Sequence, residues 1–411
     1  PLPLASLGDV RAKLYGKHLE PDDYRHIIGD IAARRYSDVD LSAFIAACAG
    51  DRMALDEVIS LTKAMIASGD ELSWNAAPIM DKHCVGGLPG NRTTLLVVPI
   101  VAAFGLTMPK TSSRAITSPA GTADTMETLA PVSLGLGEMR KVVEREGGCV
   151  AWGGSVNLSP ADDVLIRIER ALDIDGEGQL VASVLSKKAA AGSTHVVIDI
   201  PVGETAKVRS FEAAGSLSKL LSTVGRAVGL EVQATISDGS QPVGRGIGPA
   251  LEAKDVLSVL RNESNAPEDL RERALILAGQ ILELSRSVPQ GQGSRTAAQI
   301  LADGCAWRKF YAICEAQGGF REPGRAEFSH LVSAPFKGVV TAIDNRKLGR
   351  AAKLTGAPKA KTAGLELHAP ISTVVEPEQP LYTLHAETRG ELEYALEYVR
   401  SNDGILNIQE T

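Results

Sequence analysis

The sequence predicts an α/β protein made of a helical domain, a central α/β domain with a mixed sheet, and a smaller C-terminal α+β domain. Its 411 residues exceed the roughly 250–300 residues at which single hydrophobic cores stop growing. The first 75 residues carry helical periodicity, whereas short apolar runs then alternate with helical segments. A further shift in composition near residues 321–331 separates the C-terminal part.

Helical periodicity dominates residues 21–35, 40–50 and 54–69, where apolar side chains recur at spacings of three and four. Pro21 suits the first turn of a helix, and Gly50 suits a helix end. We therefore expect an α-helical domain over residues 1–75, joined by helices from about 155–190.

Short buried β or apolar runs begin near Ile79, and helical segments such as 139–147, 163–172 and 217–229 separate them. The runs cover residues 95–105, 148–154, 194–203 and 231–238. This alternation is typical of an α/β domain with mixed or parallel strands, here expected over residues 76–325. A ligand would bind at the strand ends of such a sheet.

Strand-like and helical segments also follow the shift in composition. They cover residues 336–344, 360–370, 373–387 and 391–401. We expect a C-terminal α+β domain over residues 326–411.

Composition restricts the classes of partner. A net charge of −7 and no clustered Lys or Arg argue against a nucleic-acid surface, although a phosphorylated small molecule needs only a local positive pocket. No run reaches the ~18 apolar residues of a membrane span, so we expect a cytoplasmic protein without a membrane partner. The cysteines are odd in number and lack metal-ligand spacing, which indicates neither a disulfide framework nor a metal site: Cys48, Cys84, Cys149, Cys305 and Cys314.

Two Gly/Ser/Thr-rich loops flank the apolar run at 95–105. The first loop (residues 82–94) and the second loop (residues 110–122) each contain a lysine and hydroxyl groups, with three glycines in the first loop and one in the second. Glycines let backbone N–H groups approach a ligand, and hydroxyl and lysine groups add donors and charge, so the pair predicts an oxyanion site. Such clusters are also typical of ordinary turns, and neither the P-loop nor the dinucleotide fingerprint occurs.

Other polar residues offer further candidates, each with a structural alternative. Ser183 and Lys187 are four residues apart, so on a helix they share one face, which is either a ligand surface or a solvated face. Asp175 is a candidate acid or a turn residue, and His83 is a candidate acid or base or a hydrogen-bonded structural residue. Cys84 is either reactive or a small packed side chain.

Several separated motifs resemble one known family. DKHCVGG, SSRAITSPAGTAD, LSPADD, ASVLSKK and GPALEAKDVL together resemble the thymidine phosphorylase family of nucleoside phosphorylases, whose fold is phosphoribosyltransferase-like. The longer GGLPGN loop and SRAITS are most similar to its AMP phosphorylase branch. One departure is Cys84, because thymidine phosphorylases typically place a serine there and a thiol is a weaker donor than a hydroxyl.

The resemblance implies roles for particular residues. It implies that phosphate is held by Lys82, Cys84, Thr94, Ser112 and Thr122, and that the base is recognised by Arg170, Ser183 and Lys187. In the AMP branch, Asp175 matches the acid that protonates the departing purine, and Lys207 would complement a 5′-phosphate. The other positions matching nucleotide contacts are Gly87, Ser113, Arg114, Ala115, Ile116, Thr117 and Ser118, together with Thr122 and Ser183.

The reaction implied by the resemblance is attack of inorganic phosphate on C1′ with departure of the base, in a cleft between the first two domains. We expect cleavage of a nucleoside 5′-monophosphate to free base and ribose 1,5-bisphosphate, with phosphate as co-substrate and no cofactor, in a homodimer or higher homo-oligomer. The alternatives are a thymidine (pyrimidine nucleoside) phosphorylase and a non-catalytic nucleotide-binding protein. A metal-dependent phosphoribosyltransferase is disfavoured because no acidic pair accompanies the glycine loop.

Overall fold

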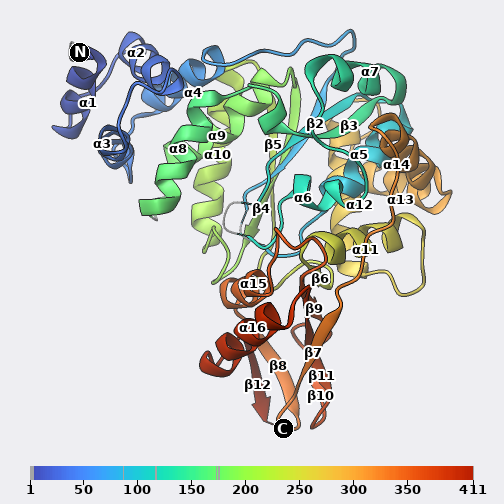
Figure 1. Ribbon diagram of the computed structural model, residues 1–411. Coiled ribbons are helices and arrows are strands. Elements are labelled where there is room, and N and C mark those ends of the chain that lie inside the picture. The colour runs from blue at the N-terminus through green and yellow to red at the C-terminus, as the bar shows by residue number, and fades with distance from the viewer. Residues whose placement is uncertain (1–3, 87, 116–117, 173, 175, 411) are drawn as a thin grey trace. The chain divides into compact units, whose positions relative to one another are not determined.

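The computed structural model describes residues 4–86, 88–115, 118–172, 174 and 176–410, apart from the side chain of Arg170. The chain forms two compact units, whose helices and strands are drawn in Figure 1. The first unit comprises residues 1–81, 156–196 and 215–234. The second unit comprises residues 82–155, 197–214 and 235–411.

Helices build most of the first unit. The three predicted N-terminal helices are present as α2 (Pro21–Ala32), α3 (Asp38–Cys48) and α4 (Leu55–Ala67), and α1 (Ser6–Leu14) precedes them. Pro21 occupies the first turn of α2, as its fixed φ favours. The later helices α8 (Pro160–Leu172) and α9 (Glu177–Ala190) share the same core, since Leu165 and Ala182 are buried with Ile28 and Phe44.

The apolar run at 95–105 forms a helix, α5 (Thr94–Phe104), although the sequence placed it among short β or apolar runs. Nine consecutive residues of this helix, from Thr94 to Ala102, are buried. A helix buried on every face is apolar throughout, so its periodicity does not distinguish it from a buried strand. Gly105 ends the helix with a φ of 105°, which a side chain would disfavour.

The other three apolar runs are strands, as predicted. They form β3 (Gly148–Trp152), β4 (His195–Val202) and β5 (Glu231–Asp238). A three-stranded sheet has the order β1-β4-β5, where β1 spans Met80–Cys84. Strand β2 (Met108–Ser112) pairs in parallel with β3, so the ends of these two strands lie together.

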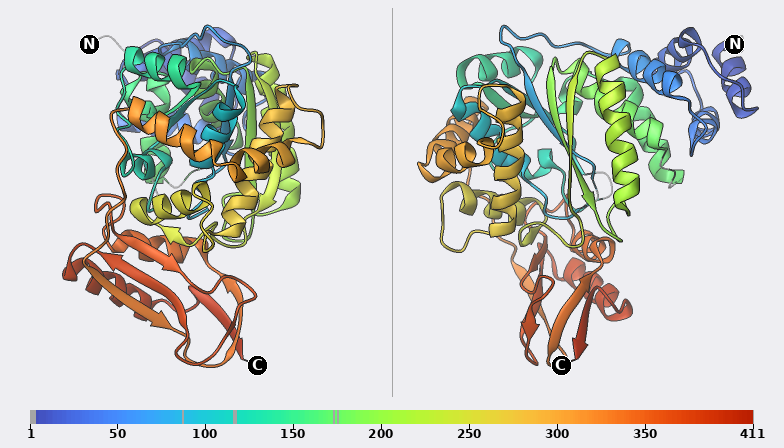
Figure 2. Two further views of the ribbon diagram at one scale, coloured as in Figure 1. Left: turned by 90° about the vertical axis from the view of Figure 1, so that its right-hand side faces the viewer. Right: turned by 180° about the vertical axis from the view of Figure 1, so that it is seen from behind.

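Helices accompany the strands along the rest of this region (Figure 2). They are α6 (Thr122–Glu127), α7 (Leu136–Glu146), α10 (Phe211–Ala227), α11 (Pro249–Leu260), α12 (Glu268–Leu284), α13 (Gly293–Ala302) and α14 (Cys305–Ala316), with a short 3-10 turn at Gly153–Ser155. No helix within the described residues is long and apolar enough to cross a lipid bilayer.

The C-terminal part of the second unit has two small antiparallel sheets. One has the order β6-β9-β11-β7 and the other the order β10-β8-β12. Their strands are β6 (Gly246–Ile247), β7 (Phe328–Ser333), β8 (Gly338–Ile343), β9 (Gly364–Leu367), β10 (Val374–Val375), β11 (Pro380–Ala386) and β12 (Leu406–Glu410). Helices α15 (Asn345–Leu354) and α16 (Arg389–Ser401) share their core, which includes Val340, Leu348 and Leu384.

Candidate functional site

Strand β1 ends on three predicted site residues, the phosphate contacts Lys82 and Cys84 and the candidate acid or base His83. Lys82 is 1% exposed, and its Nζ donates to Thr93 Oγ1 at 2.7 Å. Burial lowers the pKa of Lys82, because water no longer solvates the ammonium. His83 is half-buried beside it. The strand therefore fixes a buried amine at the start of the first loop.

A buried carboxylate, Asp199 of β4, accepts hydrogen bonds from two side chains of the first loop. It is 0% exposed. Its Oδ2 accepts from Cys84 Sγ at 3.4 Å and from Asn91 Nδ2 at 3.3 Å. Arg273 Nη1 lies 3.9 Å from the same oxygen, and the hydroxyl of Ser237 donates to Oδ1. Burial, reinforced by the charge of Asp199, raises the pKa of the Cys84 thiol to about 12.

Two predicted phosphate-binding hydroxyls lie at element ends in the second unit. Thr94 is the first residue of α5, and Ser112 is the last residue of β2. The Ser112 hydroxyl is buried, and it has no hydrogen-bond partner among the described residues. A buried hydroxyl without a partner is costly unless a ligand or water satisfies it.

The second loop folds tightly against the start of α6. A Cβ at Gly121 would lie 2.5 Å from Ala115 N and 2.6 Å from Ser113 O, so only glycine fits there. Thr122 is the first residue of α6. The Arg114 guanidinium forms two hydrogen bonds with the Glu127 carboxylate, at 2.7 and 2.6 Å. Arg114 is therefore held by an ion pair in this structure.

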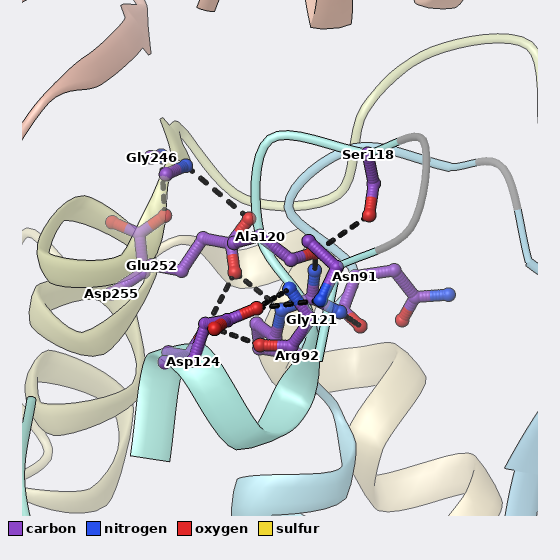
Figure 3. A network of polar contacts seen from close by, with 12 residues as sticks. Asn91, Arg92, Ser118, Ala120, Gly121, Asp124, Gly246, Glu252 and Asp255 are labelled. Carbon is purple, nitrogen blue, oxygen red and sulfur yellow. Dashed lines mark hydrogen bonds and ion pairs between the residues drawn. The ribbon is translucent and has the colours of Figure 1, made fainter. Parts of the chain in front are cut away.

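The structure brings the two loops together (Figure 3). Arg92 of the first loop donates to the carbonyl oxygen of Ala120 in the second loop and to the Glu252 carboxylate of α11. Ser118 Oγ also donates to the Ala120 carbonyl, at 2.8 Å. The two loops that flank the apolar run at 95–105 are thus in direct contact.

The predicted base-recognition residues Ser183 and Lys187 lie on α9 in the first unit. They share one face of the helix, since Lys187 Nζ lies 3.3 Å from Ser183 Oγ. Lys187 Nζ also donates to Asp162 Oδ2 at 2.6 Å, and Asp162 is 1% exposed. The buried carboxylate holds the lysine in a defined orientation.

Lys207 lies on a short, well-fixed loop after β4. Gly203 N donates to Val208 O at 3.1 Å, and Asn345 Nδ2 donates to Thr205 Oγ1 at 3.0 Å. Lys207 is exposed on this loop. The loop belongs to the second unit, as both predicted phosphate loops do.

Five predicted site residues have no structural account. Gly87, Ile116, Thr117 and Asp175 lie outside the described residues, as does the side chain of Arg170. Their assigned roles stay predictions. The structure places the remaining site residues without testing their roles.

Sequence reasoning missed the side chains that hold the loops in place, namely Asp199, Arg92 and Glu252. A signal for Asp199 was present, because a single charged residue interrupts the otherwise apolar run VVIDIPV. A charge in a buried strand requires partners. Glu252 lies within GPALEAKDVL, a motif used only for resemblance. Its burial depends on the packing of α11 and could not be read from one sequence.

Chemically, the second unit gathers a buried lysine, hydroxyls and tight glycine turns around two joined loops. These are the donors that recognise a tetrahedral oxyanion. Among the described residues, no group of three or more His, Cys, Asp or Glu side chains is arranged to hold a metal ion.

Comparisons with known proteins give three matching family models. They are "Glycosyl transferase family, helical bundle domain" over residues 10–69, "Glycosyl transferase family, a/b domain" over residues 76–307, and "Pyrimidine nucleoside phosphorylase C-terminal domain" over residues 339–405. They match the three parts of the predicted fold class.

Similar curated proteins cover nearly the whole chain. "Putative thymidine phosphorylase 1" of Acidovorax sp. (strain JS42) is 64% identical over 99% of this chain and 80% of its own length. "Putative thymidine phosphorylase" of Polaromonas sp. (strain JS666 / ATCC BAA-500) is 61% identical over 100% of this chain and 80% of its own length.

A solved structure with a similar fold is anthranilate phosphoribosyltransferase from Thermus thermophilus, with a TM-score of 0.61 and 18% identity. The similarity covers 75% of this chain and 98% of that protein. At this level of identity the likeness concerns the fold alone.

Proposed function

This chain belongs to the thymidine and pyrimidine nucleoside phosphorylase family of pentosyltransferases, and from that premise we propose that its substrate is a nucleoside 5′-monophosphate such as AMP. The products are then the free base and ribose 1,5-bisphosphate. Inorganic phosphate is the co-substrate, and the proposed reaction requires no other cofactor.

The observation that carries the proposal is the exposed lysine on the loop after β4. Lys207 is exposed on it, and hydrogen bonds at Gly203 and Thr205 fix the loop in the same unit as the two phosphate loops. A second anion site is needed only when the substrate carries its own phosphate. A lysine ammonium contributes a charge-assisted hydrogen bond to such a group.

In the proposed mechanism, the two loops hold phosphate beneath the sugar. Bound phosphate both positions the nucleophile and stabilises the positive charge of an oxocarbenium-like transition state. Lys82, Thr94, Ser112 and Thr122 are the proposed donors. Asp175 is the proposed acid for the leaving base, and Ser183 with Lys187 the proposed base contacts.

The experiment compares phosphate-dependent base release from AMP, CMP, UMP, adenosine, thymidine and uridine, for the parent and Lys207→Met. The variant should lower kcat/KM for 5′-monophosphates by about 10–100-fold, the worth of one charge-assisted hydrogen bond. Its kcat/KM for unphosphorylated nucleosides should not change. Lys141→Met is the matched control, because Lys141 is an exposed lysine of α7 in the same unit.

Cleavage of thymidine or uridine in preference to every nucleotide would instead support the runner-up, a pyrimidine nucleoside phosphorylase. The names of the similar curated proteins favour that runner-up. Nucleotide binding without phosphate-dependent turnover would identify a non-catalytic binding protein.

A further inference from the structure

We propose that Arg92 is a positioning residue for phosphorolysis, whose buried guanidinium clamps the first loop to the second loop so that the donors of both face one phosphate. This inference rests on the proposed function, since it concerns the same phosphate site. Arg92 itself does not have to touch the substrate.

The contacts of Arg92 reach three separate segments (Figure 3). Its Nε donates to the Glu252 carboxylate of α11, and its Nη2 donates to the carbonyl of Ala120 in the second loop. Its Nη1 donates to the carbonyl of Asn91 in its own loop at 3.2 Å. The Arg92 side chain is only 11% exposed. One side chain thus joins both loops to a helix.

Glu252 anchors the clamp. Its side chain is 0% exposed, and its Oε2 also accepts from Thr125 Oγ1 of α6 at 2.7 Å. Gly248 N donates to its other oxygen at 3.3 Å. A carboxylate buried this deeply requires a cation and further donors to remain charged. Arg92 supplies that cation, so the pair is a fixed point between α11, α6 and the first loop.

The base of the second loop is fastened independently, by Asp124. Its Oδ2 accepts from Ala115 N at 2.6 Å and from Gly121 N at 3.0 Å, which closes the loop onto the start of α6. This carboxylate sets the shape of the second loop, and its hydrogen bonds there do not reach the first loop. Among the described contacts, the hydrogen bond from Arg92 to the Ala120 carbonyl joins one loop directly to the other.

Registration of one loop against the other matters because the proposed phosphate donors are split between the loops. Lys82 and Thr94 belong to the first loop, whereas Ser112 and Thr122 belong to the second. A displacement of about 1 Å in catalytic geometry can cost 10²-fold in rate. Lysine could not replace Arg92, because an ammonium is a point charge and lacks the planar fork that serves two acceptors in fixed directions.

The test measures phosphate binding and turnover in Arg92→Lys, Arg92→Ala and the parent. We expect Arg92→Lys to raise the KM for phosphate by at least about 10-fold, with a smaller change in kcat, because the loops lose their registration. Millimolar methylguanidinium, which can replace the missing guanidinium, should partly restore a low KM for phosphate in Arg92→Ala. It should not change the KM for phosphate of the parent. The organic substrate is whichever nucleotide or nucleoside the parent cleaves.

Arg261→Lys is the matched control, because Arg261 pairs with Glu322 and lies over Trp307, far along the chain from both loops. It should leave the KM for phosphate unchanged. If Arg92→Ala does not fold, two milder variants replace it: Arg92→Lys, and Glu252→Gln, which weakens the ion pair without removing it. We expect phosphate to raise the melting temperature of both variants less than that of the parent.

If folded Arg92→Lys keeps a KM for phosphate and a phosphate-induced melting shift within twofold of the parent's values, the proposed function stands and the positioning role of Arg92 is overturned. Loss of stability without any change in phosphate KM would also overturn it, since that result describes a purely structural ion pair. A parent that neither binds phosphate nor uses it in turnover would overturn the proposed function, and the clamp with it.

Discussion

At the scale of single residues, Cys84 differs from the serine typical of thymidine phosphorylases, and the structure gives its thiol a particular partner. The thiol donates to the buried Asp199 carboxylate at 3.4 Å. A proton engaged by Asp199 is not available to a phosphate oxygen. The sulfur also accepts from Asn91 Nδ2 at 3.2 Å, so Cys84 belongs to the support of the first loop.

Cys84 should therefore resist alkylation. Its thiol pKa is raised to about 12, so the reactive thiolate is scarce at pH 8 and increases only as the pH rises towards that value. We expect iodoacetamide at pH 8 to modify Cys305, a half-buried cysteine near Arg308, well before Cys84. Peptide mass spectrometry over time measures both rates. Equal labelling of the two cysteines would show that the Cys84 thiol is not suppressed.

At the scale of elements, the turn between the second loop and α6 requires a glycine at position 121, because a side chain would not fit there. The backbone of residues 113–115 passes so close to Gly121 that a Cβ would lie within 2.6 Å of three backbone atoms. Backbone cannot move aside as a flexible side chain can. The close approach also places Thr122, the first residue of α6, beside the second loop.

Gly121→Ala should lower the free energy of unfolding by about 1–3 kcal/mol, the usual cost of overpacking. It should also weaken phosphate binding, because the second loop must shift. Gly137→Ala is the control, since Gly137 lies in α7 with no atom within 4 Å of the added Cβ. That variant should be neutral or stabilising by up to about 1 kcal/mol. Urea unfolding measures both, and equal stabilities for the two variants would contradict the steric account.

At the scale of the whole molecule, the C-terminal part of the second unit supports both loops. Helix α15 approaches them at Gly349, where an added Cβ would lie 3.7 Å from Pro119 Cδ and 3.8 Å from Pro89 Cγ. Asn345, at the start of the same helix, donates to Thr205 Oγ1 and to the Gly239 carbonyl. One helix therefore touches three loops that carry proposed substrate contacts.

Substitutions at Gly349 should separate helix stability from loop position. Gly349→Ala fits at ordinary contact distance and should stabilise α15 by up to about 1 kcal/mol. Gly349→Leu should press on both prolines and raise the KM for phosphate by about 10-fold through displaced donors. Steady-state kinetics with varied phosphate provide the measurement. An unchanged KM in a folded Gly349→Leu protein would show that α15 does not support the loops.

Much of the fold could be predicted because local chemistry determines it. Periodic apolar residues and Pro21 specify the N-terminal helices, and short β-rich runs specify β3, β4 and β5. The run at 95–105 was ambiguous, since a segment buried on all sides carries no periodic signal. Its helical state follows from packing, which lies outside any local window.

The sequence by itself determined the family and the three-part fold class, and it supplied the residue types of the proposed phosphate-binding site, because motifs and periodicity are properties of neighbours along the chain. Only the tertiary structure decided which side chains hold that site together. Arg92 and Glu252 are 160 residues apart, and Cys84 and Asp199 are 115 apart. A charge or polar group that is removed from water requires a charged or hydrogen-bonding partner. For these residues the partner is distant in the sequence, so only the folded structure identifies it.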